Sequence, residues 1–188
     1  MLAGTGSDVG KSILAAAFCR ILKQDGYHPA PFKAQNMALN SYATPEGLEI
    51  GRAQAVQAEA AGVPCHTDMN PLLLKPSSEH TSQVVLLGKP IGDRNAYEYF
   101  RKEGREELRK VVNESYNRLA TRYNPIVMEG AGSISEINLR DVDLVNMPMA
   151  KHAGADVFLV ADIDRGGVFA SVYGSILLQT PEERSLIK

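Results

Sequence analysis

Little in this sequence supports an extracellular, membrane or nucleic-acid setting. Its 188 residues include two cysteines, Cys19 and Cys65, and neither belongs to a Cys-x-x-Cys pair, so a disulfide framework is excluded and a reducing compartment is favoured. No apolar run is long enough to span a bilayer, and no signal peptide opens the chain. A net charge of −2 argues against a general nucleic-acid-binding protein, which is normally basic. We therefore expect a cytoplasmic protein that binds neither nucleic acid nor membranes.

The most informative stretch is AGTGSDVGKS at residues 3–12, which leads directly into the helix-forming run ILAAAF. Glycines let a backbone curl until several N–H groups point inward, and a helix N-terminus adds the positive end of its dipole. In such a loop Lys11 reaches the β- and γ-phosphates of a nucleotide, and the hydroxyl of Ser12 ligates Mg²⁺. The predicted nucleotide-binding residues are Gly6, Ser7, Asp8, Val9, Gly10, Lys11 and Ser12.

The spacing of this loop departs by one residue from the usual pattern of Gly, four residues, Gly-Lys-Ser/Thr. Counting back from Gly10 reaches Thr5, and the glycine lies one position earlier, at Gly4. The alternative interpretation is a glycine-rich turn between a strand and a helix that binds nothing. The Lys-Ser pair at the start of the helix favours the phosphate site.

The composition predicts one globular domain over residues 1–188, because 44% of the residues are hydrophobic and 22% are charged. Both ends look truncated. A phosphate-binding loop normally follows a buried strand, but only three residues precede Gly4, and the last helical segment (183–188) leads to no strand. We therefore expect a piece of a longer protein.

Strands and helices are predicted to alternate along the rest of the chain. This alternation, with polar residues after successive strands, predicts an α/β fold of the P-loop NTPase type, in which a doubly wound and mostly parallel sheet has helices on both faces. The expected helices cover residues 11–25, 49–61, 93–123, 144–152 and 168–178, and the expected strands cover 29–32, 82–88, 156–161 and a short segment that ends at Glu129. The expected buried face of the first helix consists of Leu14, Ala17, Phe18, Ile21 and Leu22.

Polar residues at the carboxyl ends of strands indicate the edge where ligands bind in open parallel sheets. Glu129 ends an apolar strand and is followed by glycines, which is how phosphate-transfer folds place an acid beside the metal; the alternative is an acidic strand end beside a turn. Glu49 either complements a helix dipole or points at Mg²⁺. Asn36 and Asn40 follow the 29–32 strand, with loop capping as the alternative. The predicted metal-binding residues are Ser12, Glu49 and Glu129.

Several stretches together resemble the N-terminal domain of the cobyric acid synthase family, glutamine-dependent amidotransferases of cobalamin biosynthesis. The extra residue in the phosphate loop also resembles dethiobiotin synthetase, a relative in the same superfamily. The stretches span nearly the whole chain, and each is far more specific than a phosphate loop alone. They are GTGSDVGKS (4–12), PFKAQNMALNS (31–41), EIGRAQAVQAEAAGV (49–63), MNPLLLKP (69–76), VMEGAGS (127–133), EINLRDVDLVNM (136–147) and LVADIDRGGVFASVYG (159–174).

The resemblance implies an ATP- and Mg²⁺-dependent ligase that converts the b, d, e and g carboxylates of adenosylcobyrinic acid a,c-diamide into amides. The route it implies passes through an acyl phosphate and uses ammonia released from glutamine. Full-length members carry a C-terminal glutaminase domain, and neither Cys19 nor Cys65 lies in the nucleophile setting of such a domain. The chain would therefore hold the synthetase half, with the corrinoid and the glutaminase domain as partners and a homo-oligomer as a possible assembly.

The resemblance also implies roles for individual residues. Lys11 would offset charge on the γ-phosphate, and Ser12 with Glu129 would hold Mg²⁺. Asp141 and Asp143 join Lys11 and Glu129 as candidate catalytic residues. Acids and arginines at strand ends also commonly form local pairs that only stabilise loops. The candidate substrate-binding residues are Asn36, Asn40, Arg140, Asp162, Asp164 and Arg165.

Three other possibilities remain open, and one of them is that the chain is only a folded nucleotide-binding module. Another carboxylate-activating synthetase of the superfamily, such as the a,c-diamide synthase or dethiobiotin synthetase, is disfavoured by the stretches FKAQNMALNS and ADIDRGGVFAS. A partitioning-type switch ATPase needs a second lysine about five positions before the invariant one, where this chain has Gly6. It would also need an amphipathic basic tail to attach to membranes, and none is present.

Overall fold

Four short parallel strands form the centre of the molecule. The structure, a computed structural model, describes residues 1–76, 81–95 and 102–188. In it β1 pairs in parallel with β10 and β2 with β9, and a parallel bridge from Leu2 to Glu129 places β9 between β1 and β2. The carboxyl ends of β1 and β9 therefore meet at one edge. The strands are β1 (Leu2–Gly4), β2 (Ala30–Phe32), β9 (Ile126–Met128) and β10 (Phe158–Val160).

A second group of strands extends this arrangement. The chain continues from β2 after two residues into β3, which pairs in parallel with β6, and β7 and β8 then add antiparallel strands. β4 and β5 form a separate antiparallel pair. The strand expected over residues 82–88 is confirmed as β7. The bounds are β3 (Gln35–Met37), β4 (Ser41–Ala43), β5 (Glu49–Gly51), β6 (Leu72–Pro76), β7 (Thr81–Leu86) and β8 (Lys89–Asn95).

The start of the helix expected over 93–123 was wrong. β8 extends to Asn95, and the described helix α4 covers Lys102–Ala120, while residues 96–101 lie outside the described residues. The turn before β8 consists of Leu87 and Gly88, both with positive φ (47° and 77°). Such a two-residue turn matches the twist of antiparallel strands, so the chain returns as a strand. A leucine at the first turn position gives no turn signal in the sequence.

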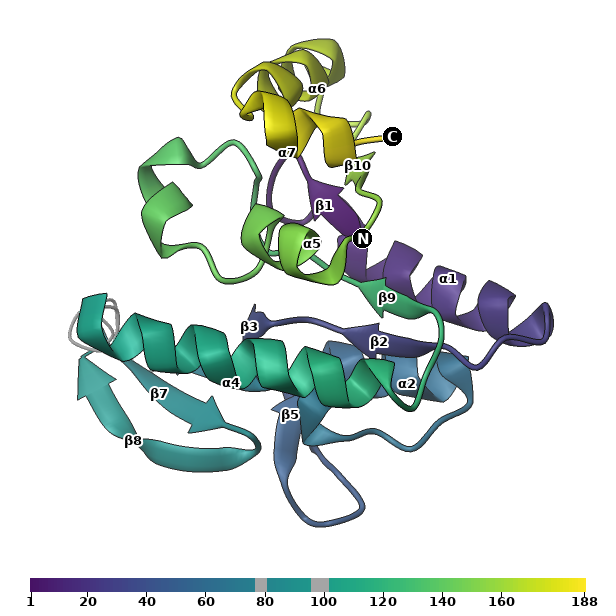
Figure 1. The fold of residues 1–188 in the computed structure, drawn as a ribbon, viewed down its shortest axis with the longest axis vertical. Helices are drawn as coiled ribbons and strands as arrows, with labels where there is room; N and C mark the ends of the chain where they lie inside the picture. Colours follow the sequence, from purple (N-terminus) through teal and green to yellow (C-terminus); the bar gives the residue numbers. More distant parts are fainter. Residues whose placement is uncertain (77–80, 96–101) are drawn as a thin grey trace.

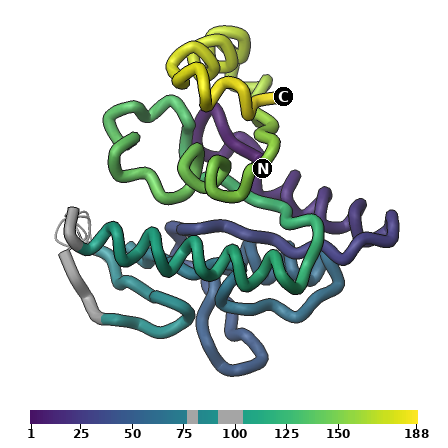
Figure 2. The backbone as a smooth tube through the Cα atoms, in the orientation of Figure 1, coloured from purple at the N-terminus to yellow at the C-terminus, as the bar shows by residue number. Residues whose placement is uncertain are grey.

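Helices cover both faces of the strands, which confirms the predicted α/β fold. α4 crosses in front of β2 and β3 and α2 lies behind them (Figure 1). Phe32 of β2 meets Tyr116 of α4 edge to face, with ring centroids 5.4 Å apart. Figure 2 shows the N-terminal strand beneath the C-terminal helices. The remaining elements are α1 (Lys11–Gln24), α2 (Arg52–Ala61), η1 (Thr67–Met69), η2 (Ile137–Val142), α5 (Met147–Ala153), α6 (Val168–Leu177) and α7 (Pro181–Leu186).

The predicted buried face of the first helix was also wrong, except at Leu22, which is half-buried and packs against the core. α1 packs against α2; its Ala15 and Cys19 are fully buried, whereas Phe18 and Ile21 are 42% and 49% exposed. Leu14 and Ala17 are exposed too. The opposing surface of α2 is rich in alanine, so the two helices approach closely only through small side chains. The periodicity of large apolar residues therefore identified the outward face.

Both cysteines are buried and unpaired, and burial raises the pKa of the Cys19 thiol to about 12. A thiol with this pKa stays neutral and is a poor nucleophile at physiological pH. Within the described ranges, no helix combines the length and the apolar content needed to cross a bilayer.

Candidate functional site

The loop between β1 and α1 encloses a hollow of about 380 Å³ at the carboxyl end of the strands. Gly10 adopts φ 98° immediately before α1, and no side chain caps the start of that helix. The first N–H groups of an uncapped helix, together with its dipole, bind anions such as phosphate. The loop residues that line the hollow are Ser7, Asp8, Gly10, Lys11 and Ser12. Of the other two predicted loop residues, Gly6 accepts a hydrogen bond from Lys11 through its carbonyl, and Val9 packs against the core.

Two backbone carbonyls hold the ammonium group of Lys11. Its Nζ donates to the oxygen of Gly6 at 2.7 Å and to that of Gly132 at 2.9 Å. Burial, and the nearby charge of Lys33, lower the pKa of Lys11. Carbonyl oxygens orient the ammonium group without neutralising it, so Lys11 presents its charge in the wall of the hollow.

Glu129 lies directly opposite the loop, where the sequence analysis expected it. Its Oε1 accepts hydrogen bonds from Ser12 Oγ at 2.7 Å and from Lys33 Nζ at 2.6 Å. Its Oε2 accepts from Gln57 Nε2 at 2.7 Å and from Gln54 Nε2 at 3.4 Å. Glu129 is only 2% exposed, and four donors satisfy its carboxylate despite this burial.

Sequence reasoning missed Lys33, Gln54 and Gln57. Lys33 directly follows β2 at the carboxyl edge of the sheet, and this position could have singled it out. The two glutamines are buried on α2 in an alanine-rich run. Gln side chains in such a run usually face solvent. Only the tertiary structure therefore reveals them as hydrogen-bond donors to Glu129.

The residues around Ser12 fit a magnesium ion. The hydroxyl of Ser12 and the carboxylate of Glu129 lie together, and Mg²⁺ is commonly held by one or two such groups plus nucleotide phosphates and water. In the part of the chain that the structure describes, no cluster of three His, Cys, Asp or Glu residues could hold a metal alone. Glu49 is not brought together with Ser12 and Glu129. It pairs with Lys75 at 2.6 Å and does not line the hollow.

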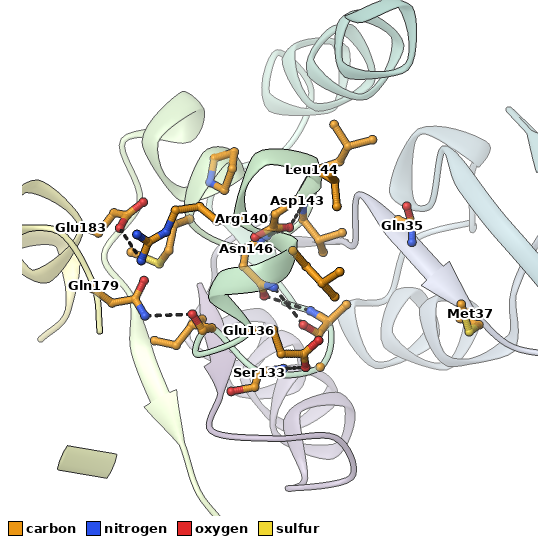
Figure 3. A pocket seen from close by; sticks show the side chains of 18 of the residues that line it. Gln35, Met37, Ser133, Glu136, Arg140, Asp143, Leu144, Asn146, Gln179 and Glu183 are labelled. Atoms are coloured by element: carbon orange, nitrogen blue, oxygen red, sulfur yellow. Dashed lines mark hydrogen bonds and ion pairs between the residues drawn. The ribbon is translucent and has the colours of Figure 1, made fainter. Parts of the chain in front are cut away.

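A second, larger cavity adjoins the first. It has a volume of about 430 Å³ and shares Met37, Ala131 and Gly132 with the hollow at the loop. Figure 3 shows Gln35 and Met37 on one side of it and the chain that contains Arg140 and Asp143 on the other. Its remaining lining is largely apolar and includes Ile134, Leu139, Val142, Leu144, Val145 and Met147.

Polar side chains of the second cavity make hydrogen bonds to backbone groups and so stabilise the conformation of its wall. Asp143 Oδ1 accepts the backbone N–H groups of Val145 at 2.7 Å and Asn146 at 3.0 Å. Burial raises the pKa of Asp143. Arg140 donates to the carbonyl of Leu178 at 2.7 Å. Asp143 and Arg140 thus lie in this cavity, while their neighbour Asp141 is exposed and lines neither cavity.

The structure separates the other predicted substrate residues. Asn36 is buried at the hollow, where its Nδ2 donates to Gln54 Oε1 at 3.1 Å, whereas Asn40 is exposed and its backbone carbonyl accepts the N–H of Arg52. In the loop after β10, Asp162 pairs with Arg165 at 3.1 Å and accepts the N–H of Asp164. This arrangement matches the alternative of local loop pairs for these three residues.

A substitution at Gly4 tests whether nucleotide binding by the loop depends on the position of the Lys11 side chain. A Cβ at Gly4 would lie 2.5 Å from Lys11 Nζ, 2.8 Å from the oxygen of Gly6 and 2.9 Å from that of Gly132. We expect Gly4→Ala to weaken ATP binding about tenfold or more, measured by calorimetric titration, since the loss of one charge-assisted contact costs about 1.5–3 kcal/mol. Gly174→Ala is the matched control, because nothing lies within 4 Å of that added Cβ. Equal affinities for the two variants would contradict the expectation.

Comparison with known proteins agrees with this geometry. The family model for the CobQ/CobB/MinD/ParA nucleotide binding domain matches residues 1–185. Over its whole length the chain is 86% identical to a cobyric acid synthase of Bacteroides fragilis, 85% identical to one of Phocaeicola vulgatus and 54% identical to one of Geobacillus thermodenitrificans. It spans 37–38% of the length of these relatives. The chain therefore belongs to the CobQ/CobB/MinD/ParA family of nucleotide-binding domains.

Proposed function

We propose that this chain is the ATP-dependent synthetase part of a cobyric acid synthase. One observation carries the proposal: Ser12 and Glu129 meet at 2.7 Å beside Lys11, at the mouth of a phosphate-binding loop. Proteins named cobyric acid synthase match the whole chain at high identity. The proposed reaction is amidation of the b, d, e and g carboxylates of adenosylcobyrinic acid a,c-diamide, with ATP and Mg²⁺ as cofactors.

The chemistry requires activation of each carboxylate. A carboxylate is a poor electrophile, and with ammonia it forms only a salt. In the proposed first step a carboxylate oxygen bonds to the γ-phosphorus of ATP while the bond to ADP breaks. Ammonia then attacks the acyl carbon, loses a proton and expels inorganic phosphate. Phosphoryl transfer of this kind depends mainly on positioning and on neutralisation of charge.

The residues of the hollow fit these demands. Lys11 offsets the charge of the transferring phosphoryl group, and the N–H groups at the start of α1 orient the phosphates. Ser12 and Glu129 would hold Mg²⁺, which would supply neutralisation of phosphate charge. Gln54 and Gln57 hold Oε2 of Glu129, so its orientation does not depend on the nucleotide.

The second cavity is the proposed entrance for the corrinoid arm that carries the reacting carboxylate. It meets the nucleotide hollow at Ala131 and Gly132, and Gly132 also accepts a hydrogen bond from Lys11. An acceptor in this cavity would therefore approach the γ-phosphate side of the loop. Arg140 and Asp143 lie in its wall, and both remain candidates for substrate contacts.

The ammonia would come from a glutaminase domain in the part of the relatives that this chain does not match. We also propose a cytoplasmic location. A homo-oligomer is a further proposal, which the exposed apolar side chains of Phe18 and Ile21 on α1 support. These side chains would be buried against a second copy.

Formation of ADP by the full-length protein tests the proposed function. We expect hydrolysis of ATP to increase when both the corrinoid and ammonia are supplied, together with formation of the amide product. Activation by a substrate other than the a,c-diamide would indicate another synthetase of the superfamily. Hydrolysis that responds to protein concentration or to membranes, and not to corrinoid, would indicate a switch ATPase. Binding of ATP without turnover under every condition would contradict the proposal.

A further inference from the structure

Lys33 pairs with the carboxylate of Glu129, which is a candidate magnesium ligand. Its Nζ lies 2.6 Å from Glu129 Oε1, and the same oxygen accepts the hydroxyl of Ser12 at 2.7 Å. Lys33 and Glu129 are 8% and 2% exposed. The ammonium group is therefore directed at the Ser12 side of the carboxylate, whereas Gln54 and Gln57 hold the other side.

The backbone of Lys33 is held in place, so only its side chain is free to move. Its N–H donates to the carbonyl of Met69 at 2.8 Å, and its own carbonyl accepts Nδ2 of Asn70 at 3.2 Å. Asn70 is itself buried and also binds Leu72. Lys33 lines the nucleotide hollow together with Lys11. Rotation of its long side chain would keep the ammonium group inside this hollow.

We propose that Lys33 and the magnesium ion compete for Oε1 of Glu129, and that Lys33 moves onto the transferring phosphoryl group when magnesium and nucleotide bind. The proposal rests on the function proposed above. Two cations that share one oxygen repel each other strongly, because two charges a few ångströms apart in a partly buried site are little screened by solvent. Phosphate oxygens held by Lys11 and the loop would offer the displaced ammonium group new acceptors.

Lys33 would then have two states with distinct tasks. With Glu129 it stabilises a buried carboxylate in the absence of metal. With the nucleotide it would add a second positive charge to the transferring phosphoryl group, next to that of Lys11. A cation that contacts charge developing in the transition state raises the rate of transfer rather than the affinity for the ground state. Lys33 is thus a candidate catalytic residue for the proposed reaction.

Binding of Mn²⁺ in the presence of ADP, whose phosphates complete the ligand set, is followed by electron paramagnetic resonance and tests the competition in the full-length protein. We expect Lys33→Met to bind Mn²⁺ about tenfold more tightly or better, because a competing interaction worth about 1.4 kcal/mol or more is removed. Lys33→Arg keeps a cation at Glu129 and should retain the original affinity. Lys75→Met removes a lysine whose partner is Glu49 and is the control outside the hollow. An unchanged or weaker Mn²⁺ affinity in Lys33→Met would overturn the proposal.

Two further observations show whether a change in Mn²⁺ affinity could come from misfolding or depends on the proposed function. Glu129 in Lys33→Met keeps three neutral donors, Ser12, Gln54 and Gln57, so we expect a folded protein. Lys33→Gln serves as a second neutral variant if the methionine variant aggregates. In single-turnover experiments we expect phosphoryl transfer to fall about a hundredfold with ATP affinity changed only a few-fold; equal losses in both would overturn the catalytic part. If corrinoid did not stimulate ATP hydrolysis by the wild-type protein, the proposed function would be refuted, while the Mn²⁺ result would still stand.

Discussion

Lys11→Ala should lower ATP-dependent phosphoryl transfer by about a hundredfold or more in the full-length protein, since removal of one electrostatic contact to a transition state costs about 3 kcal/mol. The Lys11 side chain is buried and bound by two carbonyls. Its charge therefore has a defined position, and a water molecule in its place would not supply an equally strong interaction with the phosphate. Rapid-quench measurement of ADP formation at saturating ATP gives the rate directly.

The matched control is Lys23→Ala, because Lys23 is an exposed lysine in the last turn of the same helix. We expect this variant to react at the normal rate. The unfolding free energy of Lys11→Ala should change little, because its two carbonyl partners, Gly6 and Gly132, lie at the hollow and can bind water instead. Near-normal turnover by a folded Lys11→Ala protein would refute the role assigned to this residue.

Glu129→Ala should reduce the free energy of unfolding by about 3–5 kcal/mol, the usual cost when one partner of a buried ion pair is removed. The variant leaves the ammonium group of Lys33, whose side chain is 10% exposed, without its carboxylate. Gln54 and Gln57 lose an acceptor as well. Urea denaturation of the protein without nucleotide measures this change.

A double-mutant cycle tests whether the unpaired buried charge causes the loss of unfolding free energy. Glu129→Gln keeps the shape of the side chain but removes its charge, and Lys33→Met removes the opposite charge. We expect the double variant to recover a large part of the stability that Glu129→Gln loses, because neither buried charge remains. Strictly additive losses would show that Lys33 and Glu129 do not interact energetically. Every variant at Glu129 should also lose Mg²⁺-dependent turnover.

The phosphate loop could be predicted because all its parts are contiguous in the sequence. Glycines, lysine, serine and the following helix act over a few residues, and local backbone geometry directs the N–H groups. The position of Glu129 was also predictable, although it lies far from Ser12 along the chain. Strands in a parallel sheet present their carboxyl ends at one edge, so a carboxylate at the end of a buried strand has to face the loop.

Other parts of the fold could not be predicted, because they depend on what packs against a segment. The face of α1 that is buried is the one with Ala15 and Cys19. This helix packs against α2, and its larger Phe18 is 42% exposed. The start of α4 was placed too early because the turn at Leu87 and Gly88 returns the chain as a strand. In both cases the local pattern was compatible with either outcome.

The sequence by itself determined the alternation of strands and helices, the phosphate loop and the carboxylate opposite it, because these follow from periodicity and short-range backbone geometry. Only the tertiary structure decided that Lys33, Gln54 and Gln57 surround Glu129, and that Glu49 binds Lys75 instead of the candidate metal site. These pairings join residues that are distant along the chain. Their partners are selected by the packing of α2 and β9 around one buried charge, and no local pattern encodes that selection.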